Sequence, residues 1–201
     1  MEILIATQNQ GKVQEYRELL KDTGVTFVGL DDIGLSTLDV DETGTTFEEN
    51  AILKAVAYAT ASKMYALADD SGLCVDALDG RPGVHSARYG GEGLDNAGRR
   101  QKLLGELETV PTEKRTARFE CVIAVAHPET GEVILASGSC PGHIASQESD
   151  GDNGFGYDPV FIPAGYDKTF ADIPEAEKNV LSHRGIATKN IIPKLNLLVG
   201  R

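Results

Sequence analysis

The sequence predicts an α/β fold with a mixed β-sheet. Its first third alternates short apolar runs with amphipathic segments in the order strand, helix, strand, helix, strand, and this order is typical of α/β proteins. Farther along, two apolar runs follow one another across a short turn, which predicts an antiparallel strand pair and makes the sheet mixed. The length of 201 residues fits one domain, or one core with two lobes.

The first third of the chain supplies three expected strands and two expected helices. The strands are residues 2–7, 25–30 and 64–68, and the helices are residues 11–24 and 45–63. Tyr16 and Leu20 recur at helical spacing in the first helix, which Gly24 is expected to stop. Thr46 and Glu49 have the spacing of a capping box at the start of the second helix.

The rest of the chain is expected to add a third helix, the strand pair and a closing helix. These elements are, in order, residues 94–107, 117–127, 131–145 and 181–199. Ser182 is expected to cap the closing helix, and Pro193 to kink it. Residues 78–91 and 146–158 are rich in glycine and polar side chains, which predicts loops.

Composition and charge restrict the class of protein. Hydrophobic residues make up 41% and charged residues 25%, as in globular proteins. No run of about 18 apolar residues predicts a membrane helix, and the first residues do not resemble a signal peptide. A formal net charge of −12 argues against holding DNA or RNA by its phosphates. We therefore expect a cytoplasmic protein that binds neither nucleic acid nor membrane.

The cysteines are expected to be reduced core residues. Cys74, Cys121 and Cys140 are odd in number and have no C-x-x-C spacing, which argues against a disulfide framework or a zinc site.

Residues 6–12 (ATQNQGK) form a candidate phosphate-binding turn. An expected strand runs into a polar turn that opens a helix, and a helix N-terminus offers unpaired N–H groups and partial positive charge. Lys12 adds a full charge, although the spacing is not that of a Walker A loop, since Val13 follows the lysine. The alternative is a plain strand–helix turn in which Asn9 caps the helix.

Asp69 and Asp70 directly follow the expected strand 64–68. In open α/β sheets, ligands bind at the carboxyl ends of strands. Neighbouring side chains on a strand point to opposite faces, so one carboxylate is expected to face a cleft and the other a supporting group. Carboxylates suit Mg²⁺, which needs only one or two of them together with substrate phosphates. The alternative is an Asp-Ser-Gly turn in which the carboxylates cap backbone N–H groups.

The segment 39–50 carries five acidic side chains ahead of a helix, where acids are favourable in any case. Most of them are expected to be solvated or to cap the helix. Asp41 and Glu42 are the candidates to complete a metal site with Asp70.

Two late segments suit a planar, anionic ligand. Residues 154–161 (GFGYDPVF) alternate glycine with aromatic residues, which core strands rarely do, and a ring between glycines can lie flat on a planar ligand. Residues 177–185 (EKNVLSHRG) place cations at a helix start, which is unfavourable unless an anion or a polar ligand shares the site. The alternative for each segment is a surface loop with incidental charges. The phosphate-binding turn, the carboxylate pair, the aromatic segment and the cationic segment together indicate a metal-assisted nucleotide enzyme.

Six motifs, in order, resemble the inosine/xanthosine triphosphate pyrophosphatase family: ATQNQGK, ETGTTFEENAILKA, ADDSGLCVDAL, GRPGVHSARY, GFGYDPVF and AEKNVLSHRG. They span nearly the whole chain. The resemblance implies a single two-lobed α/β domain over residues 1–201, with a long central mixed sheet flanked by helices, an active-site cleft between the lobes, and usually a homodimer. It also implies Mg²⁺-dependent hydrolysis of non-standard purine nucleoside triphosphates (ITP, dITP and XTP) to the monophosphate and pyrophosphate, which removes them from the nucleotide pool.

The resemblance further implies roles for single residues. Asp70 would bind the metal and activate water, with Asp69 as its support and Asp41 or Glu42 as a second acidic ligand. Lys54, together with Lys12 and Arg88, would neutralise charge on the departing pyrophosphate. The residues expected to contact the substrate are Thr7, Gln8, Asn9, Gln10, Gly11, Lys12, Ser71, Arg88, Phe155, Gly156, Tyr157, Asp158, Lys178, His183 and Arg184.

Discrimination between bases is expected to rest on the 6-oxo group of hypoxanthine and xanthine. Donors near His183 and Arg184 would read that oxygen while Phe155 lies against the ring, so that the amino group of adenine meets another donor and is rejected.

Two other functions stay open on the sequence. One is the related nucleotide pyrophosphatase family named for septum formation inhibition, which should lack the FGYD and SHR motifs. The other is a non-catalytic nucleotide-binding regulatory protein, which would not need the carboxylates Asp69 and Asp70.

Overall fold

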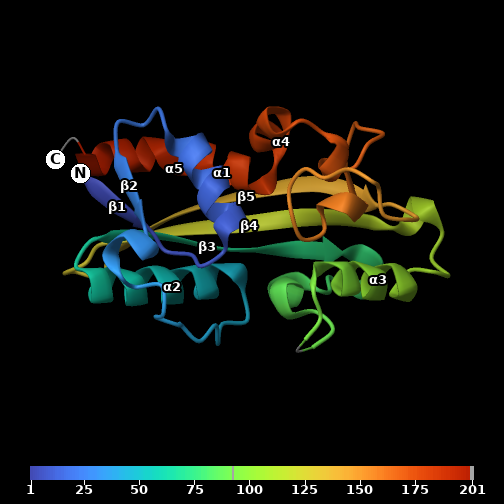
Figure 1. Cartoon of the computed structure of the whole chain (residues 1–201), viewed down its shortest axis with the longest axis horizontal. Coiled ribbons are helices and arrows are strands. Elements are labelled where there is room, and N and C mark those ends of the chain that lie inside the picture. The colour runs from blue at the N-terminus through green and yellow to red at the C-terminus, as the bar shows by residue number, and fades with distance from the viewer. Residues whose placement is uncertain (92, 200–201) are drawn as a thin grey trace. The chain divides into compact units, whose positions relative to one another are not determined.

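The computed structural model describes residues 1–91 and 93–199, and it confirms an α/β fold with one mixed sheet of six strands in the order β2-β1-β3-β4-β5-β6 (Figure 1). The chain forms two compact units. Unit 1 comprises Met1–Asp70, Cys121–Gly138 and the chain from Arg184 onward, and unit 2 comprises Ser71–Glu120 and Ser139–His183.

The predicted alternation in the first third is confirmed. Its elements are β1 (Glu2–Ile5), α1 (Gln10–Leu20), β2 (Thr26–Gly29), α2 (Phe47–Ser62) and β3 (Tyr65–Val75). Strand β1 pairs in parallel with both β2 and β3. The chain therefore reverses its direction of strand addition at β1, and the carboxyl end of such a strand is where open α/β sheets bind ligands.

The predicted caps of both helices are present. Asn9 accepts a hydrogen bond from the backbone N–H of Lys12 (3.2 Å), and Thr46 with Glu49 forms a complete capping box on α2. The expectation that α1 runs to Gly24 is wrong. The helix ends at Leu20, whose carbonyl accepts hydrogen bonds from both the hydroxyl (2.7 Å) and the N–H (3.1 Å) of Thr23.

Strand alternation divides the core of unit 1 between two faces of the sheet. Ile3, Ile5 and Leu67 pack with α1 and with α5 (His183–Val199), whereas Leu4 and Ala66 pack against α2. Figure 1 shows α1 and α5 on one side of these strands and α2 on the other. The last two side chains of β3 in unit 1, Asp69 and Asp70, are therefore expected to point to opposite helix layers, Asp69 to α1 and α5 and Asp70 to α2.

Strands β4 (Thr116–Ala126) and β5 (Val133–Ile144) are neighbours joined by a six-residue turn, in which the N–H of His127 donates to the carbonyl of Glu132 (2.9 Å). A connection this short requires an antiparallel pair, as predicted. Strand β6 (Phe161–Pro163) pairs antiparallel with the end of β5 and was not predicted, because three residues give no readable period.

Unit 2 contains α3 (Asn96–Glu106), capped by Asp95, and α4 (Glu175–Leu181). Its core includes the clustered rings of Phe119, Phe161 and Phe170. Helix α4 is not among the expected elements. Ser182 ends α4 and directly precedes α5, which is the position expected of a residue that caps the closing helix. Acidic residues in its first turn favour α4.

The predicted loop 78–91 is ordered by short 3₁₀ turns over Asp76–Leu78 and Gly83–Arg88. The buried hydroxyl of Ser86 accepts a hydrogen bond from the N–H of Leu73 (2.9 Å) and donates to the carbonyl of Gly83 (2.6 Å). Among the described residues, no helix is long and apolar enough to cross a membrane.

All three cysteines are free and buried, as predicted. Burial raises the pKa of Cys74 and of Cys140 to about 11, and burial with the charge of Asp69 raises that of Cys121 to about 12.

The native thiols should therefore react very slowly with a disulfide reagent such as DTNB. At pH 8 only about one thiol in a thousand with such a pKa is ionised, and the thiolate is the reactive form. Unfolding in guanidinium chloride should release all three thiols at ordinary rates, which serves as the control. A native cysteine that reacts within seconds would contradict the burial described here.

Candidate active site

Asp69 and Asp70 lie inside a continuous strand and not at its end. The expectation that the strand stops at Ala68, and with it the Asp-Ser-Gly turn, is wrong, because β3 runs to Val75. Pairing of β1 with β3 ends at Ile5 and Leu67, and the N–H of Ala6 makes one further bond to the carbonyl of Leu67 (2.7 Å). The two aspartates therefore lie just beyond the carboxyl end of β1, where a ligand can approach the strand.

The two carboxylates face opposite layers, as the alternation of a strand predicts. Asp69 has the parity of Leu67 and contacts α1 and α5, whereas Asp70 has the parity of Ala66 and contacts α2. Asp69 therefore does not directly support Asp70 as expected, because each carboxylate has its own set of partners.

The Asp69 carboxylate binds two cations in the interior. Its Oδ2 lies 2.9 Å from Nζ of Lys12 and 3.2 Å from an Nη atom of Arg184, and the other Nη of Arg184 donates to Glu15 (2.6 Å). Burial alone would raise the pKa of Asp69, but the charges of Lys12 and Arg184 outweigh it and hold that pKa well below its usual value. The two negative charges of Asp69 and Glu15 balance the two positive charges of Lys12 and Arg184.

The position of Arg184 shows what compensates a cation at the start of α5. We expected a ligand anion to share this site, but the anions beside Arg184 are the protein's own Asp69 and Glu15. Only 3% of the Arg184 side chain is exposed. Burial would lower the pKa of Arg184, yet Asp69 and Glu15 raise it well above its ordinary value. Its role in reading the base stays a prediction.

Asp70 belongs to a second cluster on α2. Its Oδ2 accepts a hydrogen bond from Nδ2 of Asn50 (3.1 Å), and its Oδ1 lies 3.4 Å from Nζ of Lys54, which also contacts Glu42. Burial is the main cause that raises the pKa of Asp70, Glu42 adds to it, and Lys54 opposes it. Burial would lower the pKa of Lys54, but Asp70, Asp69 and Glu42 together raise it.

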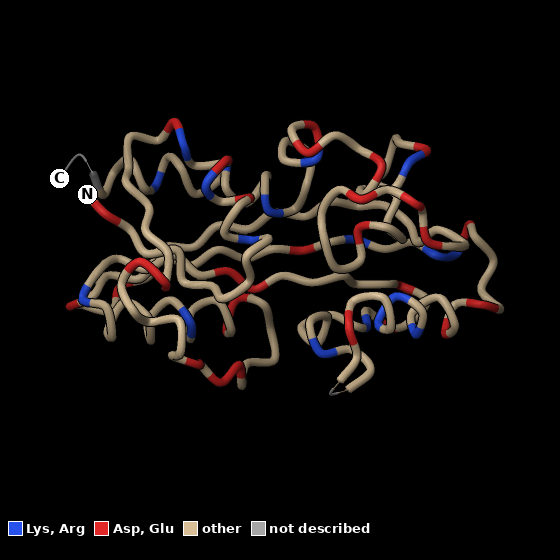
Figure 2. Tube along the Cα trace, in the orientation of Figure 1, with Lys and Arg blue, Asp and Glu red and all other residues tan. Residues whose placement is uncertain are grey.

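Of the two candidate acids, the structure brings Glu42 to this cluster. Glu42 is half-buried against Lys54, whereas Asp41 is exposed. Several acidic positions lie along the connection that leads into α2 (Figure 2). Which of them joins the cluster depends on which side chain points toward Lys54 on α2.

Sequence reasoning missed two members of these clusters, Asn50 and Glu15. Asn50 is fully buried, and its Oδ1 also accepts a hydrogen bond from the N–H of Gly44 (2.8 Å). An asparagine is a poor helix former, so its presence in the alanine-rich α2 was a usable signal. Glu15 is a charged residue on α1 next to the buried Tyr16. Nothing in its sequence context indicated that it would itself be buried.

The donor set around Asp70 fits Mg²⁺. Asp70 and Glu42 both contact the ammonium group of Lys54, and their carboxylate oxygens are the hard ligands that this ion prefers. Within the described residues, no three His, Cys, Asp or Glu side chains gather at one point. An ion here would complete its shell with water and ligand oxygens, which Mg²⁺ does readily.

The turn before α1 is built by its own side chains. The hydroxyl of Thr7 accepts a hydrogen bond from the N–H of Asn9 (3.2 Å), and Asn9 caps the helix. The Nε2 of Gln8 donates to the carbonyls of Ser36 (3.2 Å) and Leu38 (3.0 Å). No intramolecular hydrogen bond from the N–H of Gln10 or Gly11 is present in the described part of the chain. N–H groups of this kind at a helix start can donate to an anion.

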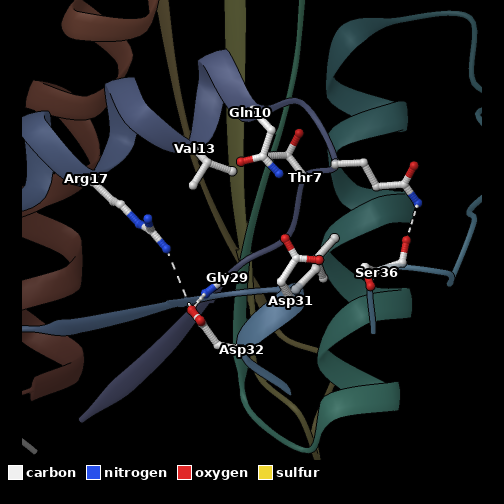
Figure 3. Close-up of a pocket in the computed structure, with 10 residues that line it drawn as sticks. Thr7, Gln10, Val13, Arg17, Gly29, Asp31, Asp32 and Ser36 are labelled. Carbon is white, nitrogen blue, oxygen red and sulfur yellow. Dashed lines mark hydrogen bonds and ion pairs between the residues drawn. The ribbon is translucent and has the colours of Figure 1, made fainter. Parts of the chain in front are cut away.

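A pocket of about 260 Å³ lies at the ends of β1 and β2 (Figure 3). It is lined by Thr7, Gln8, Gln10, Val13, Arg17, Gly29, Leu30, Asp31, Asp32 and Ser36. Its one cationic lining residue, Arg17, lies 3.7 Å from Asp32. Two aspartates in its wall disfavour a phosphate, and neither Lys12 nor Asp70 lines it. The pocket therefore does not match the predicted triphosphate site.

In unit 2, the structure brings together three of the predicted residues in and around one buried ion pair. The Oδ2 of Asp158 accepts hydrogen bonds from Nζ of Lys178 (2.8 Å) and from the N–H of Phe155 (2.7 Å). The same Nζ lies 5.3 Å from the centroid of the Phe155 ring. The hydroxyl of Tyr157 donates to the carbonyl of Ser86 (3.0 Å).

The remaining predicted residues are more dispersed. The ring of His183 is buried and stacks on Phe119, with centroids 4.7 Å apart. Ser71 follows Asp70 along β3, and Arg88 is exposed at the end of the 3₁₀ turn Gly83–Arg88.

The model of the Ham1 family matches residues 3–194. The chain belongs to the Ham1 family. This result confirms the family resemblance and selects it over the septum-formation alternative. Ham1 relatives include the dITP/XTP pyrophosphatases of Bacillus subtilis (48% identical, covering 94% of both chains) and of Oceanobacillus iheyensis (47% identical, covering 96% of this chain and 95% of that protein).

Solved structures agree with this assignment. The HAM1 protein of Coxiella burnetii has a TM-score of 0.87 and is 41% identical, with 98% of each chain covered. The Ham1 protein of Staphylococcus aureus has a TM-score of 0.85 at the same identity and coverage.

Asp69→Asn should destabilise this Ham1 protein by about 3 kcal/mol, because Lys12 and Arg184 then lose the charge that compensates them in the interior. Asp70→Asn is the matched control, since it makes the same chemical change at the next residue. The raised pKa of Asp70 means that its ionised form already disfavours folding, so a change below about 1 kcal/mol is expected. Urea denaturation at pH 7 measures both.

The pH dependence separates charge from packing in this comparison. Folding lowers the pKa of Asp69, so its stabilisation is complete above the ordinary pKa of about 4 and is lost as the pH falls below it. The stability gap between wild type and Asp69→Asn should therefore shrink in acid. Equal losses for the two variants at pH 7, or a gap independent of pH, would contradict the assignment.

Proposed function

We propose that this chain hydrolyses non-standard purine nucleoside triphosphates, with dITP, ITP and XTP as substrates, to the nucleoside monophosphate and pyrophosphate. The observation that carries the proposal is the pair of clusters on the two faces of β3, one centred on Asp69 and one on Asp70. The first presents Lys12 at the start of α1, and the second presents two carboxylates that share a single lysine. Family membership, and the names of the relatives, support it.

The phosphates would bind to the first turn of α1. The N–H groups of Gln10 and Gly11 and the ammonium of Lys12 provide positive charge there. Thr7 and Asn9 would act by holding the turn in shape, because their side chains already bond within it. Asp69 would act by fixing Lys12.

The metal would be held by Asp70 and Glu42. Mg²⁺ bound there supplies positive charge that stabilises the phosphate oxygens and the leaving pyrophosphate. Asn50 orients one oxygen of Asp70, and Lys54 remains close enough to compensate negative charge when the leaving group departs. Asp70 would also accept the proton of the attacking water, which must lie in line with the bond that breaks at the α-phosphorus.

The base would be bound by residues of unit 2. Phe155 offers a ring, and the buried Asp158–Lys178 pair and the neighbouring backbone offer hydrogen-bonding groups that can be matched to one base and left unpaired by another. His183, Ser71 and Arg88 would complete the substrate contacts. The homodimer and the cytoplasmic location stay predictions from the sequence.

Asp70→Asn should lower kcat for ITP by at least about a thousandfold while the melting temperature stays close to that of wild type, because the amide keeps the shape and loses the charge. EDTA should abolish wild-type activity and Mg²⁺ should restore it. Glu49→Gln is a charge-matched control on the exposed start of the same helix α2 that should keep its kcat. A fully active Asp70→Asn would remove Asp70 from the proposed mechanism.

The products identify the bond that breaks. Chromatography of a reaction with ITP should show IMP and pyrophosphate, as attack at the α-phosphorus requires. ATP and GTP, incubated in parallel, should be consumed far more slowly. IDP with orthophosphate would instead indicate an ordinary phosphatase, and binding of ITP without any turnover would indicate a regulatory protein.

A further inference from the structure

The loop Gly154–Asp158 has unusual backbone requirements, which explain its alternation of glycine with aromatic residues. Gly154 has φ +77°, and a Cβ there would overlap the carboxylate of Asp158 and crowd Nζ of Lys178. Gly156 has φ +64°, and nothing lies within 4 Å of a Cβ built on it. Gly154 is therefore needed for close approach to the ion pair, whereas Gly156 is needed only for its backbone conformation.

The conformation of Gly156 directs its carbonyl to Arg100, a residue of α3. One Nη of Arg100 donates to the carbonyl of Gly156 (2.8 Å), and its Nε donates to Oε2 of Glu148 (2.8 Å). Only 15% of the Arg100 side chain is exposed. A single planar guanidinium thus joins two points, eight residues apart, of a segment that contains no helix or strand.

This clamp complements the other anchors of the loop. The carboxylate of Asp158 accepts hydrogen bonds from Lys178 and from the N–H of Phe155, and the hydroxyl of Tyr157 donates to the carbonyl of Ser86. The peptide after Gly156 is held by Arg100. Because glycines on both sides of Phe155 give the backbone wide freedom, the direction of its ring depends on these anchors.

We propose that Arg100 is a positioning residue for the base: through its bonds to Gly156 and Glu148 it holds the loop in the conformation that presents Phe155. This inference rests on the proposed function of the loop as the base site. Arg100 acts through the loop, and the phosphate and metal clusters on β3 have partners of their own in unit 1. Loss of the clamp should therefore weaken binding of the base in the ground state and the transition state alike, which raises KM and leaves kcat unchanged.

The test uses steady-state kinetics of the full chain with ITP and Mg²⁺. Arg100→Gln should raise KM about tenfold with kcat within about twofold. Arg100→Lys should not rescue KM, since an ammonium cannot reproduce the two-point fork. Glu148→Gln should give a smaller rise, and the double variant should resemble Arg100→Gln alone, because the two residues form one unit. The inhibition constant of pyrophosphate should stay unchanged.

The matched control is Lys102→Gln, which removes one positive charge from the same helix, where Lys102 pairs with Glu106 (2.7 Å). Figure 2 shows the Lys and Arg positions along α3. A weaker pyrophosphate affinity in Arg100→Gln, or an equal rise of KM in Lys102→Gln, would show that Arg100 acts by its charge on the phosphates and would overturn the proposal.

Hydrogen exchange separates this inference from the proposed function. The amides of residues 154–158 should exchange faster in Arg100→Gln than in Lys102→Gln or wild type, with unchanged exchange in β1 and α2. If wild type does not hydrolyse ITP, the proposed function fails and the exchange result alone decides whether the clamp exists. Unchanged exchange in the loop, with unchanged KM, would overturn the clamp.

Discussion

The buried carboxylate of Asp69 is the interaction on which the arrangement of unit 1 depends. It holds Lys12 at the start of α1 and Arg184 at the start of α5 against the same strand. Each of these cations would be costly to bury alone, and the group works because Glu15 supplies the second negative charge. The start of both helices is thereby fixed relative to β3, and Lys12 is directed to the place where α1 exposes its first N–H groups.

Two adjacent aspartates acquire opposite properties because a strand sends them to opposite faces. Asp69 meets two cations and its pKa falls, whereas Asp70 meets one lysine that it shares with Glu42 and its pKa rises. The cluster around Asp69 holds the starts of two helices against β3, and the cluster around Asp70 offers two carboxylates of the kind that a divalent cation prefers. Burial is similar for both, so the balance of neighbouring charges decides the outcome.

In unit 2, the backbone conformation of two glycines places the loop 154–158. Its glycines allow one peptide to approach a buried ion pair and another to turn its carbonyl toward a guanidinium. Lys178 and Arg100 are satisfied by Asp158, Glu148 and a carbonyl within the unit. Lys178 and Arg184 are the cations that the sequence suggested for a ligand, and each is bound by acceptors of the protein itself, which keeps its side chain in a defined position.

The sequence by itself determined the order of the longer strands and helices, the caps at Asn9 and Thr46, the antiparallel pair β4–β5 and the opposed directions of Asp69 and Asp70. All of these follow from local periods, from residue types at helix ends, or from strand parity. Only the tertiary structure decided that Glu42 and not Asp41 joins Lys54, that Asn50 and Glu15 belong to the clusters, and that β3 continues through both aspartates. Those outcomes depend on which side chains from distant segments meet. Apart from the unusual asparagine in the alanine-rich α2, the neighbours of these residues in sequence do not indicate their partners. Strand β6 likewise forms because the core of unit 2 buries Phe161 and Pro163, and three residues have too little intrinsic preference to be predicted from sequence.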